Sequence, residues 1–282
     1  MQNLTKKKVG YVALIGRPNS GKSTFINTLL DEKVSIISNR PQTTQKVIKW
    51  IYNDTESQII FFDTPGINEN KEGFYEILRE NVLNSLKNAE VIVRFIDSSR
   101  QYWREEQEIE EILQNVSAPI IEVYSKVDLV KSPKTDKLNI SSQDKTWYAE
   151  LISQIKNFLK EDFPYYDEDY YTDQDIYTRI TEIIREKIFT DFKEEVPYSV
   201  YLEVGEIEET PRLLKVQVYL YTETDSQKKI IIWKWAENLT KIGTESRLEL
   251  EKILDKKIFL SLRVKVMPKW KRNKKLLNKL YN

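Results

Sequence analysis

The first half of the chain alternates short apolar runs with stretches in which apolar residues recur at helical spacing. Short apolar runs bounded by turn residues predict β-strands, and they cover residues 9–16, 47–53, 58–63, 91–97 and 119–125. Helical spacing predicts helices near residues 22–31, 74–87, 104–115 and 144–160. Strands that alternate with helices in this way build an α/β domain with a doubly wound, mostly parallel sheet.

The second half has fewer elements, and its strands alternate apolar with polar residues. The pattern predicts a helix near 175–192, strands near 198–204 and 214–222, a helix near 237–254 and a last strand over 258–266. This order predicts a smaller α+β domain. The stretch KKIIIWKWA, residues 228–236, has the β-propensity of another strand, which would pair with 214–222 across TETDSQ.

Length and charge also indicate two domains. The 282 residues suffice for about two domains of ordinary size. Net charge is zero, but residues 226–282 hold sixteen Lys or Arg and five Asp or Glu, a net +11 that leaves −11 before them. Residues 150–175 hold eight acids and two lysines. We therefore expect one domain at 1–165, an acidic linker at 166–175, and a second domain with a basic tail at 176–282.

Composition excludes several kinds of chemistry. The chain has no cysteine and no histidine, which excludes disulfides, Cys and His metal sites, cysteine nucleophiles and histidine general bases. Charged residues make up 31% of the chain, and no apolar run approaches the ~20 residues that cross a bilayer. We expect a globular, cytoplasmic monomer whose chemistry uses carboxylates, amines, hydroxyls and backbone amides.

A phosphate-binding loop follows the first predicted strand. Residues 16–23 read GRPNSGKS, an instance of GxxxxGKS/T between a strand and a helix, which is the context that this motif requires. Backbone N–H groups would surround the phosphates, Lys22 would neutralise β- and γ-phosphate oxygens, and the Ser23 hydroxyl would be a Mg²⁺ ligand. The candidate phosphate-contacting residues are Gly16, Arg17, Pro18, Asn19, Ser20, Gly21, Lys22, Ser23 and Thr24. The loop alone indicates a nucleoside triphosphate but not its base.

A second phosphate motif, DTPG, ends the third predicted strand and comprises Asp63, Thr64, Pro65 and Gly66. The Asp63 carboxylate can reach Mg²⁺ through water, and the Gly66 N–H can contact a γ-phosphate. The motif lies about 40 residues after the phosphate loop, as in P-loop nucleotide-binding proteins.

The base is indicated by SKVD, residues 125–128, which ends another predicted strand. The Asp128 carboxylate can accept hydrogen bonds from guanine N1–H and N2–H₂, which adenine does not offer, so Asp128 disfavours an ATPase. Lys126 can lie flat over the base, and Ser125 completes the motif. The three motifs in series predict a guanine-nucleotide site.

These residues resemble the Era family of translation-factor-like GTPases, and the resemblance spans nearly the whole chain. It includes GRPNSGKSTFIN, SIISNRPQTTQ, DTPG, SKVD and ISS in the first half, and REKIF, EEVPYSV, KKIII, KIGTESRLELEKIL and IFLSLRVKV in the second. The resemblance implies a P-loop GTPase domain followed by a type II KH-like domain. It also implies a GTP-hydrolysing switch that binds small-subunit ribosomal RNA near its 3′ end and assists 30S assembly.

The resemblance implies roles for further residues. Thr44, in PQTTQ, matches the switch threonine that closes on Mg²⁺ and the γ-phosphate. The implied Mg²⁺ ligands are therefore Ser23, Thr44 and Asp63, and the implied catalytic groups are Lys22, Thr44 and Gly66. GTP is the implied substrate and GDP a product.

Four other positions adjust this expectation. Ser141 and Ser142, in ISS, stand where the family contacts guanine. Ile67 follows Gly66, where many GTPases have a water-orienting Gln, so we expect slow intrinsic hydrolysis and name no general base. Ser125 replaces the usual Asn that ties the base to the phosphate loop, and one missing hydrogen bond, about 1 kcal/mol, predicts weaker guanine binding that stays selective.

The larger departure is WKWA, residues 233–236, at the place of the KH glycine loop. Glycines there let the backbone approach nucleotides closely, which two tryptophans forbid. Two outcomes are open: the indoles stack on bases, or they pack into the core or onto a partner and close the RNA cleft. The expected RNA-contacting residues are Lys228, Lys229, Trp233, Lys234, Trp235, Lys241 and Arg247.

The basic C-terminal stretch leaves a second hypothesis open. PKWKRNKKLLNKL resembles a short basic amphipathic segment, so peripheral contact with the inner face of the cell membrane is an alternative to RNA contact. The alternative function is a guanine-nucleotide-dependent interaction protein whose degenerate KH loop no longer binds RNA.

Overall fold

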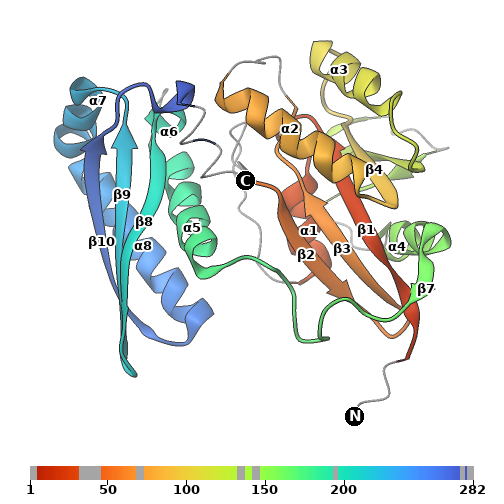
Figure 1. Ribbon diagram of the computed structural model, residues 1–282. Helices are drawn as coiled ribbons and strands as arrows, with labels where there is room; N and C mark the ends of the chain where they lie inside the picture. The colour runs from red at the N-terminus through yellow and green to blue at the C-terminus, as the bar shows by residue number, and fades with distance from the viewer. Residues whose placement is uncertain are drawn as a thin grey trace. The chain divides into compact units, whose positions relative to one another are not determined.

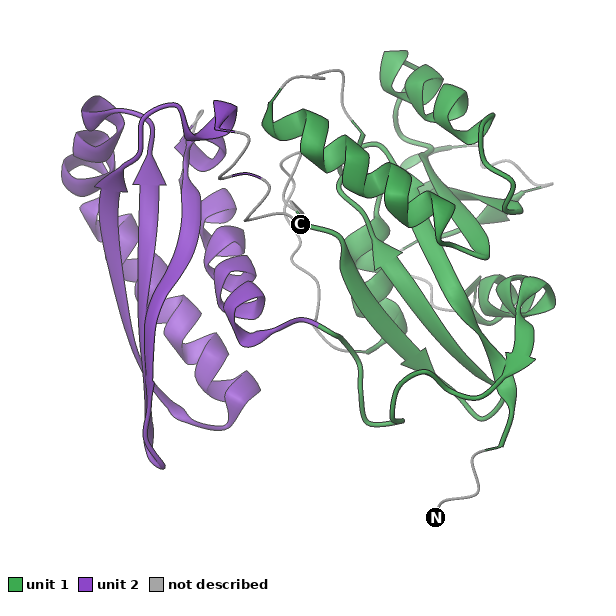
Figure 2. Cartoon of the chain, in the orientation of Figure 1, with its two compact units in different colours: residues 1–173, 280–282 green, residues 174–279 purple. Residues whose placement is uncertain are grey.

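The computed structural model describes residues 5–31, 46–67, 73–131, 137–141, 147–192, 196–273 and 277. It divides into two compact units between Asp173 and Gln174 (Figures 1 and 2). No helix within the described ranges is long and apolar enough to span a membrane.

The first unit is a mostly parallel sheet with helices on both faces (Figure 1). Its strand order is β2-β3-β1-β4-β5-β6; β2 is antiparallel to β3, β7 is antiparallel to β1, and the other neighbours are parallel. The strands are β1 (Lys7–Gly16), β2 (Ile48–Asn53), β3 (Ser57–Asp63), β4 (Val91–Asp97), β5 (Ile120–Ser125), β6 (Leu138–Asn139) and β7 (Lys160–Asp162). The helices are α1 (Lys22–Leu29), α2 (Phe74–Lys87), α3 (Arg104–Leu113) and α4 (Trp147–Phe158). The predicted doubly wound α/β fold is confirmed.

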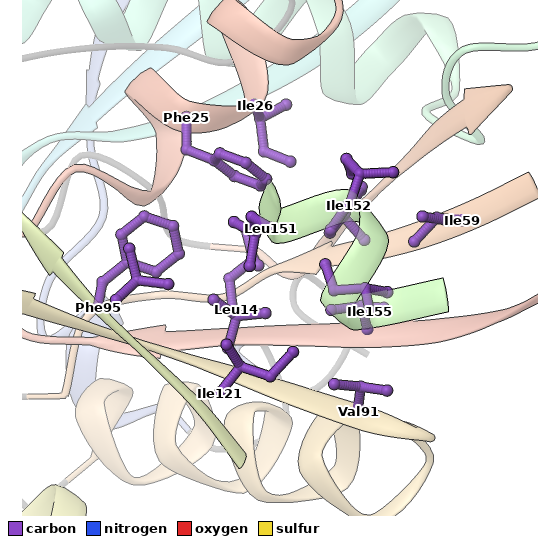
Figure 3. Close-up of a cluster of buried hydrophobic side chains, with 14 of the residues drawn as sticks. Leu14, Phe25, Ile26, Ile59, Val91, Phe95, Ile121, Leu151, Ile152 and Ile155 are labelled. Carbon is purple, nitrogen blue, oxygen red and sulfur yellow. The ribbon is translucent and has the colours of Figure 1, made fainter. Parts of the chain in front are cut away.

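The core of this unit explains why its central strands are almost wholly apolar. Helices α1 and α4 cover one face of the sheet, where Phe25 and Leu151 pack over Leu14 (Figure 3). Helices α2 and α3 cover the other face, where Val82 and Ile109 are buried. Because β1 is covered on both sides, its consecutive residues are buried rather than alternating. Burial of each such side chain contributes roughly 1.5–3 kcal/mol, which fixes the strand ends that carry the motifs.

The second unit is a three-stranded sheet with two long helices on one face (Figure 1). Strand β9 lies in the centre, antiparallel to β8 and parallel to β10. The elements are α5 (Ile176–Asp191), α6 (Val196–Ser199), β8 (Tyr201–Glu209), β9 (Leu213–Thr222), α7 (Asp225–Lys229), α8 (Ala236–Leu254) and β10 (Lys257–Val266). Alternate residues of β9 are buried under α5 and α8. The predicted α+β unit is confirmed.

Residues 228–236 do not form the strand that their β-propensity predicts. They continue α7 into a π-helix over Ile230–Lys234, and α8 follows. Strand β9 already pairs with β8 on one edge and β10 on the other, so it offers no free edge to a further strand. Thr224 and Gln227 also form a capping box that starts α7. Pairing elsewhere in the sheet therefore overrides local propensity.

The acidic segment that precedes the second unit lies along the edge strand β2. Ile51 N donates to Tyr171 O at 2.9 Å, and the Lys49 ammonium pairs with Asp173 at 2.8 Å. The buried Gln58 side chain accepts hydrogen bonds from the backbone N–H groups of 165 and 166. The segment thus shields an otherwise open sheet edge.

Replacing Thr224 by Ala should destabilise the second unit by about 1 kcal/mol, because Gln227 N loses its hydroxyl acceptor at the start of α7. Urea unfolding measures the change. The control is Thr244→Ala on α8, whose exposed hydroxyl donates to Thr240 O in its own helix; it should be neutral or stabilising, because Ala is the better helix former. Equal losses in both variants would contradict the role of the cap.

Candidate functional site

The phosphate loop joins β1 to α1 at the carboxyl edge of the sheet. Gly21 is the N-cap of α1 and has φ 100°, a left-handed conformation that favours glycine. Among the described residues, no side chain caps this helix start. The first N–H groups of α1, together with the positive end of its dipole, are therefore directed to an anion.

Lys22 is buried inside this loop. Its Nζ donates hydrogen bonds to the carbonyl oxygens of Gly16 and Arg17, both at 3.2 Å. Burial lowers the pKa of Lys22 to about 8, while the negative charges of Asp63 and Glu106 act in the opposite direction. The ammonium has lost most of its hydration, and phosphate oxygens would replace it with charge-assisted hydrogen bonds.

Asp63 and Ser23 meet beside this ammonium. The fully buried Asp63 ends β3, and its Oδ2 accepts a hydrogen bond from Ser23 Oγ at 3.0 Å. Carboxylate and hydroxyl oxygens suit Mg²⁺. No group of three acidic side chains that could hold a cation alone occurs in the described parts of the chain. The pair therefore fits a Mg²⁺ ion that is shared with phosphate oxygens, as in P-loop proteins.

The rest of the DTPG motif is fixed by contacts with the sheet and the phosphate loop. A Cβ on Gly66 would lie 2.6 Å from Pro18 N, so only glycine permits this approach. The buried Thr64 hydroxyl donates to Leu14 O at 2.6 Å, which ties the motif to β1 and directs that side chain away from the loop. Ile67 is buried in the core beneath α2, where its side chain cannot orient water.

A cavity of about 170 Å³ opens beside the phosphate loop, at the carboxyl ends of β1 and β5. It brings together the SKVD motif, the ISS stretch and the phosphate loop, which lies about a hundred residues before the other two. Its lining residues are Gly21, Thr24, Phe25, Thr28, Ser125, Lys126, Asp128, Leu129, Ile140, Ser141 and Trp147. The cavity places the exposed Asp128 carboxylate where a base linked to the phosphates would lie.

Ser125 still ties β5 to the phosphate loop despite its short side chain. Its hydroxyl donates to Ser20 O at 2.7 Å, with Ile96 O also nearby at 3.2 Å. A Cβ on Gly21 would lie 3.7 Å from Ser125 Cβ, an ordinary contact, so the left-handed φ and not crowding favours glycine there. The connection to the phosphate loop that an Asn usually makes is therefore made here by the buried Ser125.

Comparisons with known proteins agree with this geometry. Residues 11–126 match the family described as 50S ribosome-binding GTPase, and residues 195–271 match the KH domain. GTPase Era of Borrelia turicatae is 36% identical over 98% of this chain and 100% of its own length. GTPase Era of Caldanaerobacter subterraneus is 39% identical over 97% of each chain. The chain belongs to the Era family of GTPases.

Solved Era structures extend the similarity to both units. A crystal structure of Era in complex with MgGDPNP and nucleotides 1506–1542 of 16S ribosomal RNA superposes with a TM-score of 0.91, at 34% identity over 96% of this chain and 98% of that one. An Era variant from Aquifex aeolicus bound to GDP and AlF₄⁻ has a TM-score of 0.88 at 35% identity, with the same coverage. The P-loop GTPase domain followed by a KH domain is thus confirmed.

In this Era-family GTPase, several side chains that position the site carry no sequence motif. The buried Asp97 accepts a hydrogen bond from Lys126 Nζ at 2.7 Å. Burial alone would raise the pKa of Asp97, but hydrogen bonds from Lys126 and Ser99 outweigh it and hold the pKa below its usual value. Trp147 Nε1 donates to Ser141 O at 2.9 Å and so fixes the ISS stretch. Asp97 ends an apolar strand, the one signal that could have identified it.

Arg17 acts as an anchor of the phosphate loop. Its guanidinium pairs with Glu105 at 2.5 Å and donates to Gln101 O, next to the start of α3. Arg100 in turn donates to Pro18 O at 3.3 Å. The Arg17 side chain is therefore directed to α3, and its backbone is what remains for phosphate contact. The predicted Thr44 and Ser142 lie outside the described residues, so their roles stay predictions.

The predicted RNA-contacting cations of the second unit fall into two groups. Lys241 pairs with Asp191 at 2.8 Å, and Arg247 pairs with Glu251 at 3.0 Å. For Lys228, Lys229 and Lys234, in contrast, the described residues provide no carboxylate within ion-pair distance. Of these five cations, the three without a carboxylate partner therefore lie on α7 and the π-helix.

The two tryptophans of the WKWA stretch have different surroundings. Trp235 packs against Phe192, with 5.7 Å between ring centroids, at the border of the core. Trp233 is 82% exposed. Packing, one of the two outcomes left open by the sequence, is thus observed for Trp235 alone.

Replacing Ser125 by Ala should weaken GDP binding about fivefold, because the hydroxyl that joins β5 to Ser20 is removed, at a cost of ~1 kcal/mol. Isothermal titration with GDP measures the change. The matched control is Ser85→Ala on α2, since that buried hydroxyl also bonds a backbone carbonyl, Asn81 O, far along the chain from these motifs. Unchanged GDP affinity in the Ser125 variant would show that the tie does not support binding.

GDP affinity should be level below about pH 8 and should fall above it, approaching tenfold per pH unit. The pKa of Lys22 is about 8 in the unliganded protein, and bound phosphate favours the protonated ammonium, so a proton must be taken up once the free amine predominates. Titrations between about pH 7 and 9 test this. Lys22→Arg stays charged throughout and should give a flat profile; parallel slopes would assign the titration to another group.

Proposed function

We propose that this chain is a GTP-hydrolysing switch that binds small-subunit ribosomal RNA and assists assembly of the 30S subunit. The observation that carries the proposal is the cavity in which Asp128, Lys126 and Ser141 adjoin the phosphate loop. A base lying there would present its N1–H and N2–H₂ groups to Asp128, which only guanine offers. The triphosphate would extend from that base onto the start of α1.

The chain's own groups supply the chemistry of hydrolysis. The loop amides and the Lys22 ammonium hold the phosphates and stabilise the negative charge that develops on them. Ser23, Asp63 and the predicted Thr44 would hold Mg²⁺, which would supply neutralisation of the phosphate charge. Gly66, pressed against Pro18, is placed to offer its N–H to the γ-phosphate. Ile67 is buried, so intrinsic hydrolysis should be slow.

RNA binding is proposed for the second unit. The KH match covers 195–271, and the similar Era structure contains 16S ribosomal RNA together with a GTP analogue. The net +11 over residues 226–282 supports contact with a phosphate backbone. A protein that acts on ribosomal RNA is expected in the cytoplasm. Whether it also contacts the membrane surface is tested below.

Replacing Asp128 by Asn should lower GTP affinity about tenfold to a hundredfold, because a charged acceptor of two hydrogen bonds is removed. It should raise affinity for xanthosine triphosphate, since the Asn amide can donate to the 2-carbonyl of xanthine. Competition binding with both nucleotides measures the exchange. The control Glu122→Gln, at a carboxylate on β5 outside the cavity lining, should leave the preference for guanine unchanged. Loss of affinity for both nucleotides alike would contradict base selection by Asp128.

An RNA oligomer from the 3′ end of small-subunit ribosomal RNA should bind the GTP-loaded protein with marked salt dependence. If four phosphates are neutralised, log affinity should fall against log salt concentration with a slope near −3, which is ~0.7 for each phosphate. Fluorescence anisotropy at several salt concentrations tests this, with anionic lipid vesicles in parallel. Absence of RNA binding together with vesicle binding would favour the alternative interaction protein. In growing cells, crosslinking and sequencing of bound RNA should show enrichment at that 3′ end.

A further inference from the structure

Trp233 is held outward by the residues on either side of it. The π-helix carries an i→i+5 bond from Trp235 N to Ile230 O at 3.2 Å. Ile231 is fully buried in the core, and Trp235 packs on Phe192. Residues four apart share one face of a helix, whereas residues two apart do not. The two anchors at 231 and 235 therefore direct position 233 away from the core.

The surroundings of this indole combine positive charge with a small apolar surface. Lys228, Lys229 and Lys234 lie on the same short helical segment, and none of them forms an ion pair with a carboxylate of the described residues. Ile230 and Ile232 are each 40% exposed. We call these five residues, with Trp233, the tryptophan tip. A π-helical turn is uncommon and often marks a functional position.

We propose that Trp233 is a base-stacking anchor for single-stranded RNA; this rests on the proposed RNA-binding function. Every base offers a π-face to an aromatic ring, so stacking needs no close approach of backbones and tolerates different bases. The neighbouring ammonium groups can neutralise the phosphates on either side of the stacked base. The tip would thus bind RNA by stacking of the indole on a base and by ion pairs with phosphates. A glycine loop instead binds through close approach of its backbone to the RNA.

A nucleic acid suits the tip better than a lipid surface does. Binding at a membrane interface scales with the apolar area that is buried, and stable attachment needs more than one weak anchor. The tip offers one indole and two isoleucines whose larger part is already buried. A single base–aromatic stack, in contrast, needs only one exposed ring.

The test uses the full chain, loaded with a non-hydrolysable GTP analogue, and the RNA oligomer from the 3′ end of small-subunit ribosomal RNA. Trp233→Ala should weaken RNA binding about 5- to 140-fold, the range that removal of one stacked base implies. Trp233→Phe keeps an aromatic face and should stay within about threefold of the parent protein. Urea unfolding of the second unit should have the same midpoint in all three proteins, which shows that the unit carrying Trp233 is folded in each variant.

Salt dependence separates stacking from charge. The Trp233→Ala variant should keep the parent slope of log affinity against log salt, because no charge is removed. Lys228→Ala with Lys229→Ala should instead flatten the slope by ~0.7 for each phosphate that is no longer neutralised. A flattened slope in the Trp233→Ala variant would assign the weaker binding to the phosphate backbone and overturn the proposal.

Three further results would also overturn it. One is equal RNA affinity of the parent and Trp233→Ala proteins, which would leave the proposed function intact. A second is tighter RNA binding by Trp233→Gly with Ala236→Gly, since glycines would then serve better than the ring. A third is loss of anionic-vesicle binding in Trp233→Ala with RNA binding unchanged. Failure of the parent protein to bind RNA would instead reject the proposed function itself.

Discussion

The carboxyl ends of adjacent strands meet at one edge of the first unit's sheet, and the nucleotide site depends on this meeting. Strand β1 ends at Gly16, β3 at Asp63, β4 at Asp97 and β5 at Ser125. The register places Asp97 opposite Ser125. Because the central strands are buried on both faces, a shift of any one strand would disturb two cores. The packed sheet thus sets the spacing between the groups that bind phosphate, metal and base.

Charge at this edge favours an anion, because a buried ammonium lies beside the start of α1. Lys22 is buried, and its lowered pKa reports the cost of holding a desolvated ammonium. Two other basic side chains near the loop have carboxylate partners: Arg17 pairs with Glu105, and Lys126 pairs with Asp97. Those pairs fix the loop and the base-binding motif before a ligand arrives. Nucleotide binding therefore loses little free energy to the ordering of these protein groups.

The second unit shows how one stretch can serve both core and surface. The stretch Ile230–Trp235 supplies Ile231 and Trp235 to the packing beneath α8, and in the same turn it projects Trp233. A strand would have alternated its side chains across a sheet, but both edges of β9 are occupied. The capping box at Thr224 then makes a helix the available conformation. Trp233 is exposed to a partner because this stretch forms a helix and not a strand.

Features that rest on local chemistry could be predicted from the order of residues alone. These features include the motifs GRPNSGKS, DTPG and SKVD at strand ends, and the helical and strand spacings of apolar residues. Each can be predicted because it depends on residues only a few positions apart. The helical state of residues 228–236, the tie from Ser125 to Ser20, and the parts played by Asp97 and Trp147 became visible only in the folded chain. Each depends on groups distant in the chain, whose approach is set by sheet order and packing, and no local pattern records that approach.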